Sequence, residues 1–149
     1  MSEVQIVQTT LGGTTAEHVQ LMLERGARES GQFTVMGRLE GETAFLAFDG
    51  AANRIENVVG ALIYKVAEDE PPAFFLPLMY VLPSFRKQGI GRSIMTKAIR
   101  CAELVGCTDF AIHVKSSNLQ MLCLLDAMSL EQRSFRFHLS IVPHATELP

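Results

Sequence analysis

Apolar positions along the chain recur with two different periods, and their order predicts the fold. Short apolar runs bounded by turn residues predict strands at residues 4–8, 43–48, 58–66, 73–81, 109–114 and 134–142. Apolar residues spaced for one face of a helix predict helices at residues 14–29, 90–105 and 118–128. The order is strand, helix, three strands, helix, strand, helix, strand, which predicts an α/β fold (α+β type) with helices packed on a mixed sheet.

Length and composition predict one core. The chain has 149 residues, 48% of them hydrophobic, so residues 1–149 are predicted to form a single domain. The net charge is only -3 and the basic residues are scattered, which argues against nucleic acid or a membrane surface as a partner. No apolar run has membrane-spanning length and no secretory leader is evident, so a cytoplasmic location is expected.

Three cysteines, Cys101, Cys107 and Cys123, lie in apolar segments without C-x-x-C spacing. They are therefore expected to be buried thiols, with neither a disulfide framework nor a metal site.

The segment from Met79 to Ser93 carries the most chemical information. A strand ends in V-L-P, a turn follows, and a helix begins among glycines. At a helix start the backbone N–H groups lack helical partners and the helix dipole attracts anions. Gly89 and Gly91 allow a phosphate to approach the backbone, and the basic residues of the turn add positive charge. This combination suits a pyrophosphate.

Two familiar phosphate motifs do not fit this segment. A P-loop requires G-x-x-x-x-G-K-[ST], which the chain lacks. A dinucleotide fingerprint requires a glycine where Ile94 stands and an acidic residue closing the next strand, whereas Asp109 opens that strand. Both alternatives are excluded by position.

The pattern R-x-x-G-x-G after a strand ending in V-x-P resembles the acyl-CoA signature of the GNAT superfamily. The resemblance extends to residues 118–130, where an asparagine opens a helix, and to the element order from Val4 to Val142. It implies the GNAT fold, a mostly antiparallel mixed sheet of about six to seven strands flanked by helices. It also implies a bulged fourth strand that splays from the fifth, in keeping with Pro77 inside the fourth strand.

The resemblance implies acetyl-CoA as the cofactor, with the pantetheine arm in the gap between the two strands and the pyrophosphate at the turn. A backbone N–H near Met79 is expected to stabilise the developing oxyanion. Asn118 is either a cofactor contact or simply a helix cap. The implied cofactor residues are Met79, Tyr80, Val81, Arg86, Lys87, Gln88, Gly89, Ile90, Gly91, Arg92, Ser93 and Asn118.

The family's chemistry is direct attack of an amine on the thioester, which calls for a base and an acid. Leu125 stands where many members carry the acid tyrosine, and Leu125 cannot donate a proton. The candidates that remain are Tyr80, Glu70 and His113, each with a structural alternative: a packed ring, a solvated acidic loop and a structural histidine, respectively.

The sequence therefore predicts an N-acetyltransferase that moves an acetyl group from acetyl-CoA to a primary amine of a small molecule or peptide. One alternative is a catalytically weak or inactive acyl-CoA-binding regulatory domain, favoured by Leu125. Another is an interaction module that binds no cofactor. Strand edges near the last strand make a homodimer an open alternative to a monomer.

Overall fold

The computed structural model describes residues 4–30, 38–67, 72–107, 109–114, 119–128 and 136–141. Its strands are β1 (Val4–Thr10), β2 (Thr43–Asp49), β3 (Val58–Ala67), β4 (Ala73–Val81), β5 (Asp109–Val114) and β6 (Arg136–Ile141). Its helices are α1 (Gly13–Ser30), α2 (Ile90–Leu104) and α3 (Leu119–Ala127), with short 3-10 turns η1 (Ile55–Asn57) and η2 (Pro83–Phe85). The predicted element order is confirmed.

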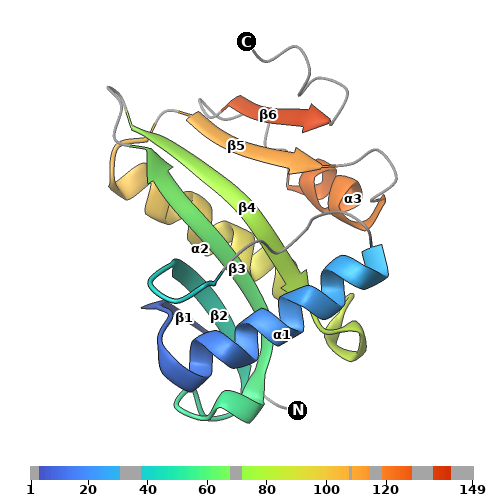
Figure 1. Cartoon of the computed structure of the whole chain (residues 1–149). Coiled ribbons are helices and arrows are strands. Elements are labelled where there is room, and N and C mark those ends of the chain that lie inside the picture. The colour runs from blue at the N-terminus through green and yellow to red at the C-terminus, as the bar shows by residue number, and fades with distance from the viewer. Residues whose placement is uncertain are drawn as a thin grey trace.

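The described strands form one six-stranded sheet in the order β1-β2-β3-β4-β5-β6. The first four strands pair antiparallel, whereas β4, β5 and β6 run parallel to one another. Helix α1 crosses one face of the sheet, and α2 lies on the opposite face with α3 beside it (Figure 1). This architecture confirms the predicted mixed-sheet α/β class.

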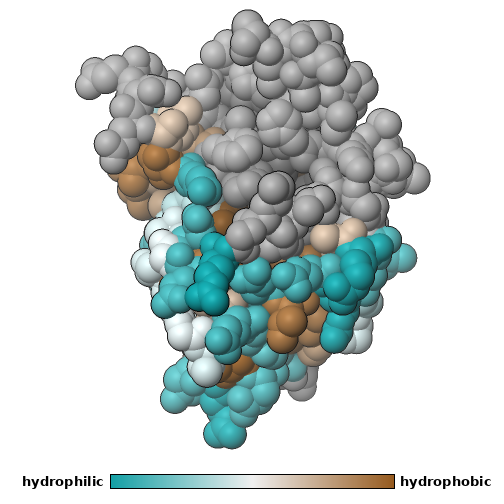
Figure 2. All heavy atoms as spheres, in the orientation of Figure 1, coloured by the Kyte–Doolittle hydropathy of each residue, from teal (hydrophilic) through white to brown (hydrophobic). Residues whose placement is uncertain are grey.

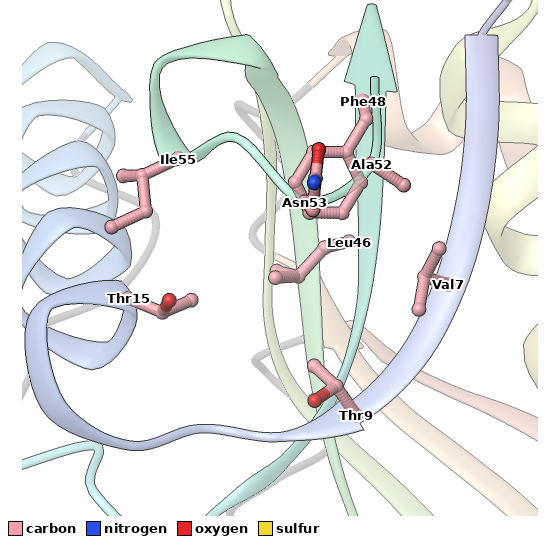
Figure 3. A pocket seen from close by; sticks show the side chains of 8 residues that line it. All are labelled: Val7, Thr9, Thr15, Leu46, Phe48, Ala52, Asn53 and Ile55. Carbon is pink, nitrogen blue, oxygen red and sulfur yellow. The ribbon is translucent and has the colours of Figure 1, made fainter. Parts of the chain in front are cut away.

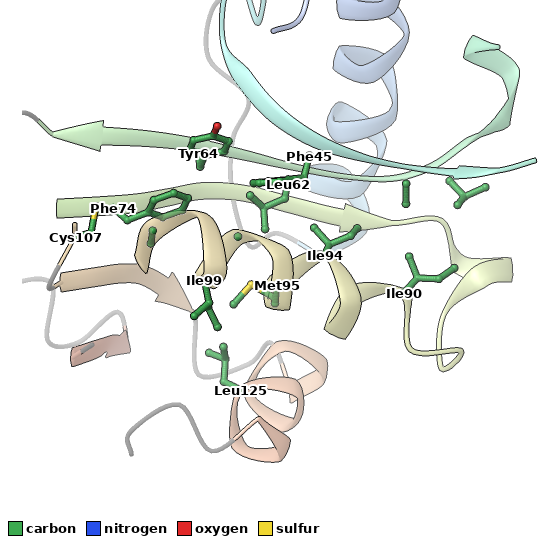
Figure 4. Close-up of a cluster of buried hydrophobic side chains, with 14 residues drawn as sticks. Phe45, Leu62, Tyr64, Phe74, Ile90, Ile94, Met95, Ile99, Cys107 and Leu125 are labelled. Atoms are coloured by element: carbon green, nitrogen blue, oxygen red, sulfur yellow. The ribbon is translucent and has the colours of Figure 1, made fainter. Parts of the chain in front are cut away.

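Each face of the sheet carries its own apolar cluster. Under α1, Val19 and Leu23 are fully buried against the sheet residues Leu46 and Ile63. On the other face, α2 contributes the residues Ile90, Ile94, Met95, Ala98, Ile99 and Ala102. Figure 4 shows this second cluster between the sheet and α3. The alternation of buried side chains between the two faces positions consecutive β4 residues toward different helices.

Strand β4 is irregular where the functional segment begins. Leu76 and Pro77 of β4 together oppose Tyr64 of β3, which is a bulge. Strand β4 pairs with β5 only from Ala73 to Leu76. In the described part of the chain, the edge of β4 from Pro77 to Val81 has no pairing with β5. The expected bulge and splay are confirmed, and they leave a strand edge free for a ligand.

The prediction of buried cysteines holds fully for Cys107 alone. Cys107 is buried and Cys101 is half-buried, but Cys123 is exposed. The prediction of a buried Cys123 is wrong because α3 turns Leu125 toward the core and Cys123 toward solvent. Among the described residues, no cluster of histidine, cysteine or acidic side chains could hold a metal ion. None of the described helices combines the length and apolar character that a membrane crossing needs.

Candidate active site

The turn from β4 into α2 has an unusual backbone. Lys87 has a φ of 63° and Gly89, which caps α2, has a φ of 84°. Both angles lie in the left-handed region, which glycine adopts freely and a lysine adopts at a cost of about 1 kcal/mol. Turns of this kind orient consecutive N–H groups toward a common point and so form anion-binding concavities.

The first turn of α2 presents free amides. The first helical hydrogen bond runs from the Ser93 N–H to the Gly89 carbonyl at 2.9 Å. The N–H groups of Ile90, Gly91 and Arg92 precede that bond and therefore have no carbonyl within the helix. The side chain of Ile90 is buried in the core, so its contribution to a ligand site is its amide. These amides and the helix dipole favour an anion at this end of α2.

Gly91 lies where a side chain would fill the space next to β4. A Cβ atom at this position would be 3.1 Å from Cε of Met79 and 3.7 Å from Cδ2 of Leu124. Glycine therefore lets the start of α2 approach the end of β4 and α3 closely. The amides of α2 and the free edge of β4 line the same region, and this arrangement fits an extended ligand with a phosphate at one end.

The basic residues of the turn divide into two kinds. Lys87 and Arg92 are exposed and make no ion pair with any described residue. Arg86 instead contacts the protein: its Nε donates to the Val81 carbonyl at 2.8 Å, and its Nη2 lies 3.4 Å from Oε1 of Glu29. Lys87 and Arg92 therefore carry charges without an ion pair among the described residues, while Arg86 also anchors the turn to β4 and α1.

Tyr80 points away from the free amides, toward α1. Its side chain is 7% exposed, and its hydroxyl donates to Oε1 of Glu29 at 2.8 Å. The Arg86 guanidinium lies over the ring, 5.1 Å from its centre. Burial first, and then the hydrogen bond to Glu29, raise the pKa of Tyr80 above its usual value. Tyr80 is therefore a neutral donor whose hydroxyl proton already has a partner.

Glu29 was not among the residues predicted from the sequence. It lies in the last turn of α1, and its partner Tyr80 follows 51 residues later. The local sequence around Glu29 shows only that an acidic residue lies on the exposed side of α1, which does not by itself identify a functional residue. The surface over the C-terminal part of α1 is hydrophilic (Figure 2). The fold thus brings a carboxylate to the end of β4 that sequence spacing does not reveal.

The other predicted residues lie in different places. Glu70 and Asn118 lie outside the described residues, as does the side chain of His113. The backbone of His113 follows Ile112, the last β5 residue paired with β4, so it lies where the strands separate. Leu125 is 2% exposed and packs in the apolar cluster, with Ile99 facing it in Figure 4.

A separate pocket of about 170 Å³ lies between β1, β2 and the start of α1 (Figure 3). It is lined by Val7, Thr9, Thr15, Leu46, Phe48, Ala52, Asn53 and Ile55. None of these residues belongs to the predicted site. The pocket is therefore not part of the anion-binding turn.

The sequence model of the Acetyltransferase (GNAT) family matches residues 16–126. No curated protein sequence matches the chain. The similar solved structures include the aminoglycoside N-acetyltransferase AAC(6')-Iy in complex with CoA. It is 19% identical, with 86% of this chain and 88% of that chain covered and a TM-score of 0.63.

Two further structures have the same fold. Arabidopsis thaliana NAA60, in complex with a bisubstrate analogue, is 17% identical over 84% of this chain and 83% of its own, with a TM-score of 0.63. The ribosomal-protein-alanine N-acetyltransferase of Brucella melitensis is 16% identical over 85% of this chain and 90% of its own, with a TM-score of 0.64. At these identities the likeness establishes the fold.

Proposed function

The chain belongs to the GNAT acetyltransferase family, and on that premise we propose that it acetylates a primary amine by direct attack within a ternary complex. The acyl donor is acetyl-CoA, and the enzyme is an N-acetyltransferase. The observation that carries the proposal is the free edge of β4 from Pro77 to Val81 beside the unpaired amides of α2.

The cofactor is held by backbone more than by side chains. The amides of Ile90, Gly91 and Arg92 bind the pyrophosphate, and the exposed charges of Lys87 and Arg92 strengthen that contact. Gln88 and Ser93, both exposed, border the same turn. The free edge of β4 binds the pantetheine arm as a sheet edge binds an added strand.

Acetyl-CoA supplies an activated thioester, whose acetyl carbon forms a bond to the amine nitrogen as the bond to sulfur breaks. A backbone N–H near Met79 on the free edge stabilises the carbonyl oxygen during attack. A thiolate is a good enough leaving group to depart as the anion, and it can take its proton from the solvent after the bond to carbon has broken. The absence of a tyrosine at Leu125 is therefore compatible with turnover. Glu70 and His113 remain candidates for the base.

The acceptor is proposed to be a primary amine of a small molecule or a peptide. The similar structures carry the names of aminoglycoside, ribosomal-protein-alanine and NAA60 acetyltransferases, which supports an amine acceptor without choosing between these classes. A regulatory domain that binds acyl-CoA without turnover is the second candidate. It is favoured by Leu125, which is buried in the core and cannot act as an acid. The cytoplasmic location and the homodimer stay predictions.

The test is calorimetric titration of acetyl-CoA into the wild type and two charge-reversal variants of α2. Arg92→Glu places a negative charge beside the proposed phosphate site, and acetyl-CoA affinity should fall at least about 10-fold, the scale of one charge-assisted hydrogen bond. The same change favours the helix dipole, so folding should not suffer. Arg100→Glu, exposed on the same helix about two turns later, is the matched control and should bind as the wild type does.

The outcomes separate the candidates. Equal affinities in all three proteins, or no wild-type binding at millimolar acetyl-CoA, would contradict the proposed cofactor site. Binding followed by thiol release with an amine supports the transferase. Binding without release in the presence of aminoglycoside, polyamine and peptide amines identifies the regulatory alternative.

A further inference from the structure

Within the described part of the chain, one oxygen of the Glu29 carboxylate accepts hydrogen bonds and the other accepts none. Oε1 accepts hydrogen bonds from the Tyr80 hydroxyl at 2.8 Å and from Nη2 of Arg86 at 3.4 Å. Among the residues that the structure describes, no donor contacts Oε2. The Glu29 side chain is 41% exposed, so the carboxylate is accessible to solvent and to a ligand.

The two donors hold the carboxylate in a fixed orientation. Tyr80 is itself held by its surroundings, because its ring packs against Gly26 of α1 on one side and under the Arg86 guanidinium. Arg86 is tied to the end of β4 through the Val81 carbonyl. An acceptor oxygen supported in this way keeps its position without a further entropy loss when a donor arrives.

The carboxylate lies near the proposed reaction centre. Tyr80 stands between Met79 and Val81, in the part of β4 that pairs with β3 but not with β5. Glu29 contacts the tip of the Tyr80 side chain, so it lies on the α1 face, one side chain away from that part of β4. This places a hydrogen-bond acceptor on the side of β4 opposite α2, away from the amides that bind the phosphates.

One positive side chain adjoins the Glu29 carboxylate. The guanidinium of Arg86 lies over the Tyr80 ring, and its Nη2 is 3.4 Å from Oε1 of Glu29. The Arg86 charge partly offsets that of Glu29, so this carboxylate attracts a further cation less strongly than an unpaired one, and the neutral amine is the form that can attack a thioester. A neutral amine needs an acceptor that orients its lone pair, and Oε2 is such an acceptor.

We propose that Glu29 is a catalytic residue that accepts an N–H of the acceptor amine on Oε2, with Tyr80 and Arg86 as positioning residues. The assignment rests on the proposed amine acetylation. The proposal places the acceptor amine between α1 and the end of β4. It also gives a role in the reaction to the hydrogen bond between Tyr80 and Glu29, which sequence spacing does not predict.

The test is direct binding of an acceptor to the intact chain saturated with CoA. Tobramycin, spermidine and trialanine are titrated calorimetrically into the wild type, Glu29→Gln and Glu17→Gln. Glu17 is exposed on the same helix, so its variant is a matched loss of charge at the opposite end. We expect Glu29→Gln to weaken binding of at least one of these amines about 10-fold or more, with Glu17→Gln unchanged. CoA affinity should stay within about 2-fold of wild type in every protein.

Steady-state kinetics distinguish contact with the amine from a purely structural role of Glu29. With a bound amine that is acetylated, Glu29→Gln should lower kcat/KM for that amine 10-fold or more. Tyr80→Phe, which removes one of the two donors to Oε1, should show a smaller loss in kcat/KM for the amine. This order of effects distinguishes contact with the amine from a general loss of structure.

Three results would overturn the assignment: equal amine affinity in wild type and Glu29→Gln, binding of none of the three amines, or parallel loss of amine and CoA binding. Turnover is scored separately. If an amine binds through Glu29 but is not acetylated, the proposed transfer fails while the Glu29 contact stands. If Glu29→Gln acetylates an amine as well as the wild type does, the proposed transfer stands while the Glu29 contact fails.

Discussion

Gly26 offers a prediction in which packing and helix propensity oppose each other. The residue lies in the interior of α1, where glycine is about 1 kcal/mol less favourable than alanine. A Cβ atom on Gly26 would lie 2.6 Å from Cε1 and 2.8 Å from Cγ of Tyr80. Both distances are well below ordinary van der Waals contact, so the ring or the helix would have to move.

The magnitude follows from two opposing terms. Overpacking costs about 1–3 kcal/mol, and the upper end applies because Glu29 and Arg86 hold the Tyr80 ring in place. Subtracting the helix gain of about 1 kcal/mol leaves a net loss near 2 kcal/mol for Gly26→Ala. In a Tyr80→Ala background the clash disappears, and the same change should raise the free energy of unfolding by up to about 1 kcal/mol.

Urea unfolding of wild type, both single variants and the double variant forms the required cycle. The expected coupling between the two positions is about 3 kcal/mol, and the sign of the Gly26→Ala effect should reverse between backgrounds. If Gly26→Ala has the same effect with and without the tyrosine ring, the packing of Tyr80 against α1 described above is incorrect.

Two further predictions concern ionisable groups. Because the pKa of Tyr80 is raised in the folded protein, its contribution to stability is present below about pH 10 and should be lost as the pH rises through the higher folded value. Urea midpoints at pH 9 and pH 11 should therefore show the wild type losing more stability than Tyr80→Phe. An equal loss in the two proteins would contradict the raised pKa of Tyr80. Iodoacetamide should alkylate the exposed Cys123 first and spare Cys107, whose pKa burial raises. Peptide mass spectrometry checks this order, with Cys123→Ser as control, and faster labelling of Cys107 would contradict it.

The regular parts of the fold were predictable because their signals are local. The bounds of β4 and β5, residues 73–81 and 109–114, were predicted as found, since turn residues interrupt the apolar runs on both sides. The start of α2 was predictable because Gly89 and Gly91 follow a proline-ended strand. The family resemblance added the splay of β4 from β5, which periodicity alone does not indicate.

Contacts between residues far apart in the sequence could not be predicted. The hydrogen bond between Tyr80 and Glu29 joins residues 51 positions apart, and no local pattern pairs them. The contacts of Arg86 with Val81, Tyr80 and Glu29 were equally hidden in the sequence, and its role as a phosphate ligand stays a prediction. Cys123 was misplaced because α3 is apolar on almost every side, so its periodicity does not reveal which face is buried.

The central claim is that acetyl-CoA binds at the free edge of β4 and the first turn of α2. Amide hydrogen–deuterium exchange with and without acetyl-CoA tests it most directly. The account predicts slower exchange in peptides covering residues 78–93, with no change in peptides covering β1 and the start of α1. Protection confined to other segments, or none at saturating acetyl-CoA, would contradict it.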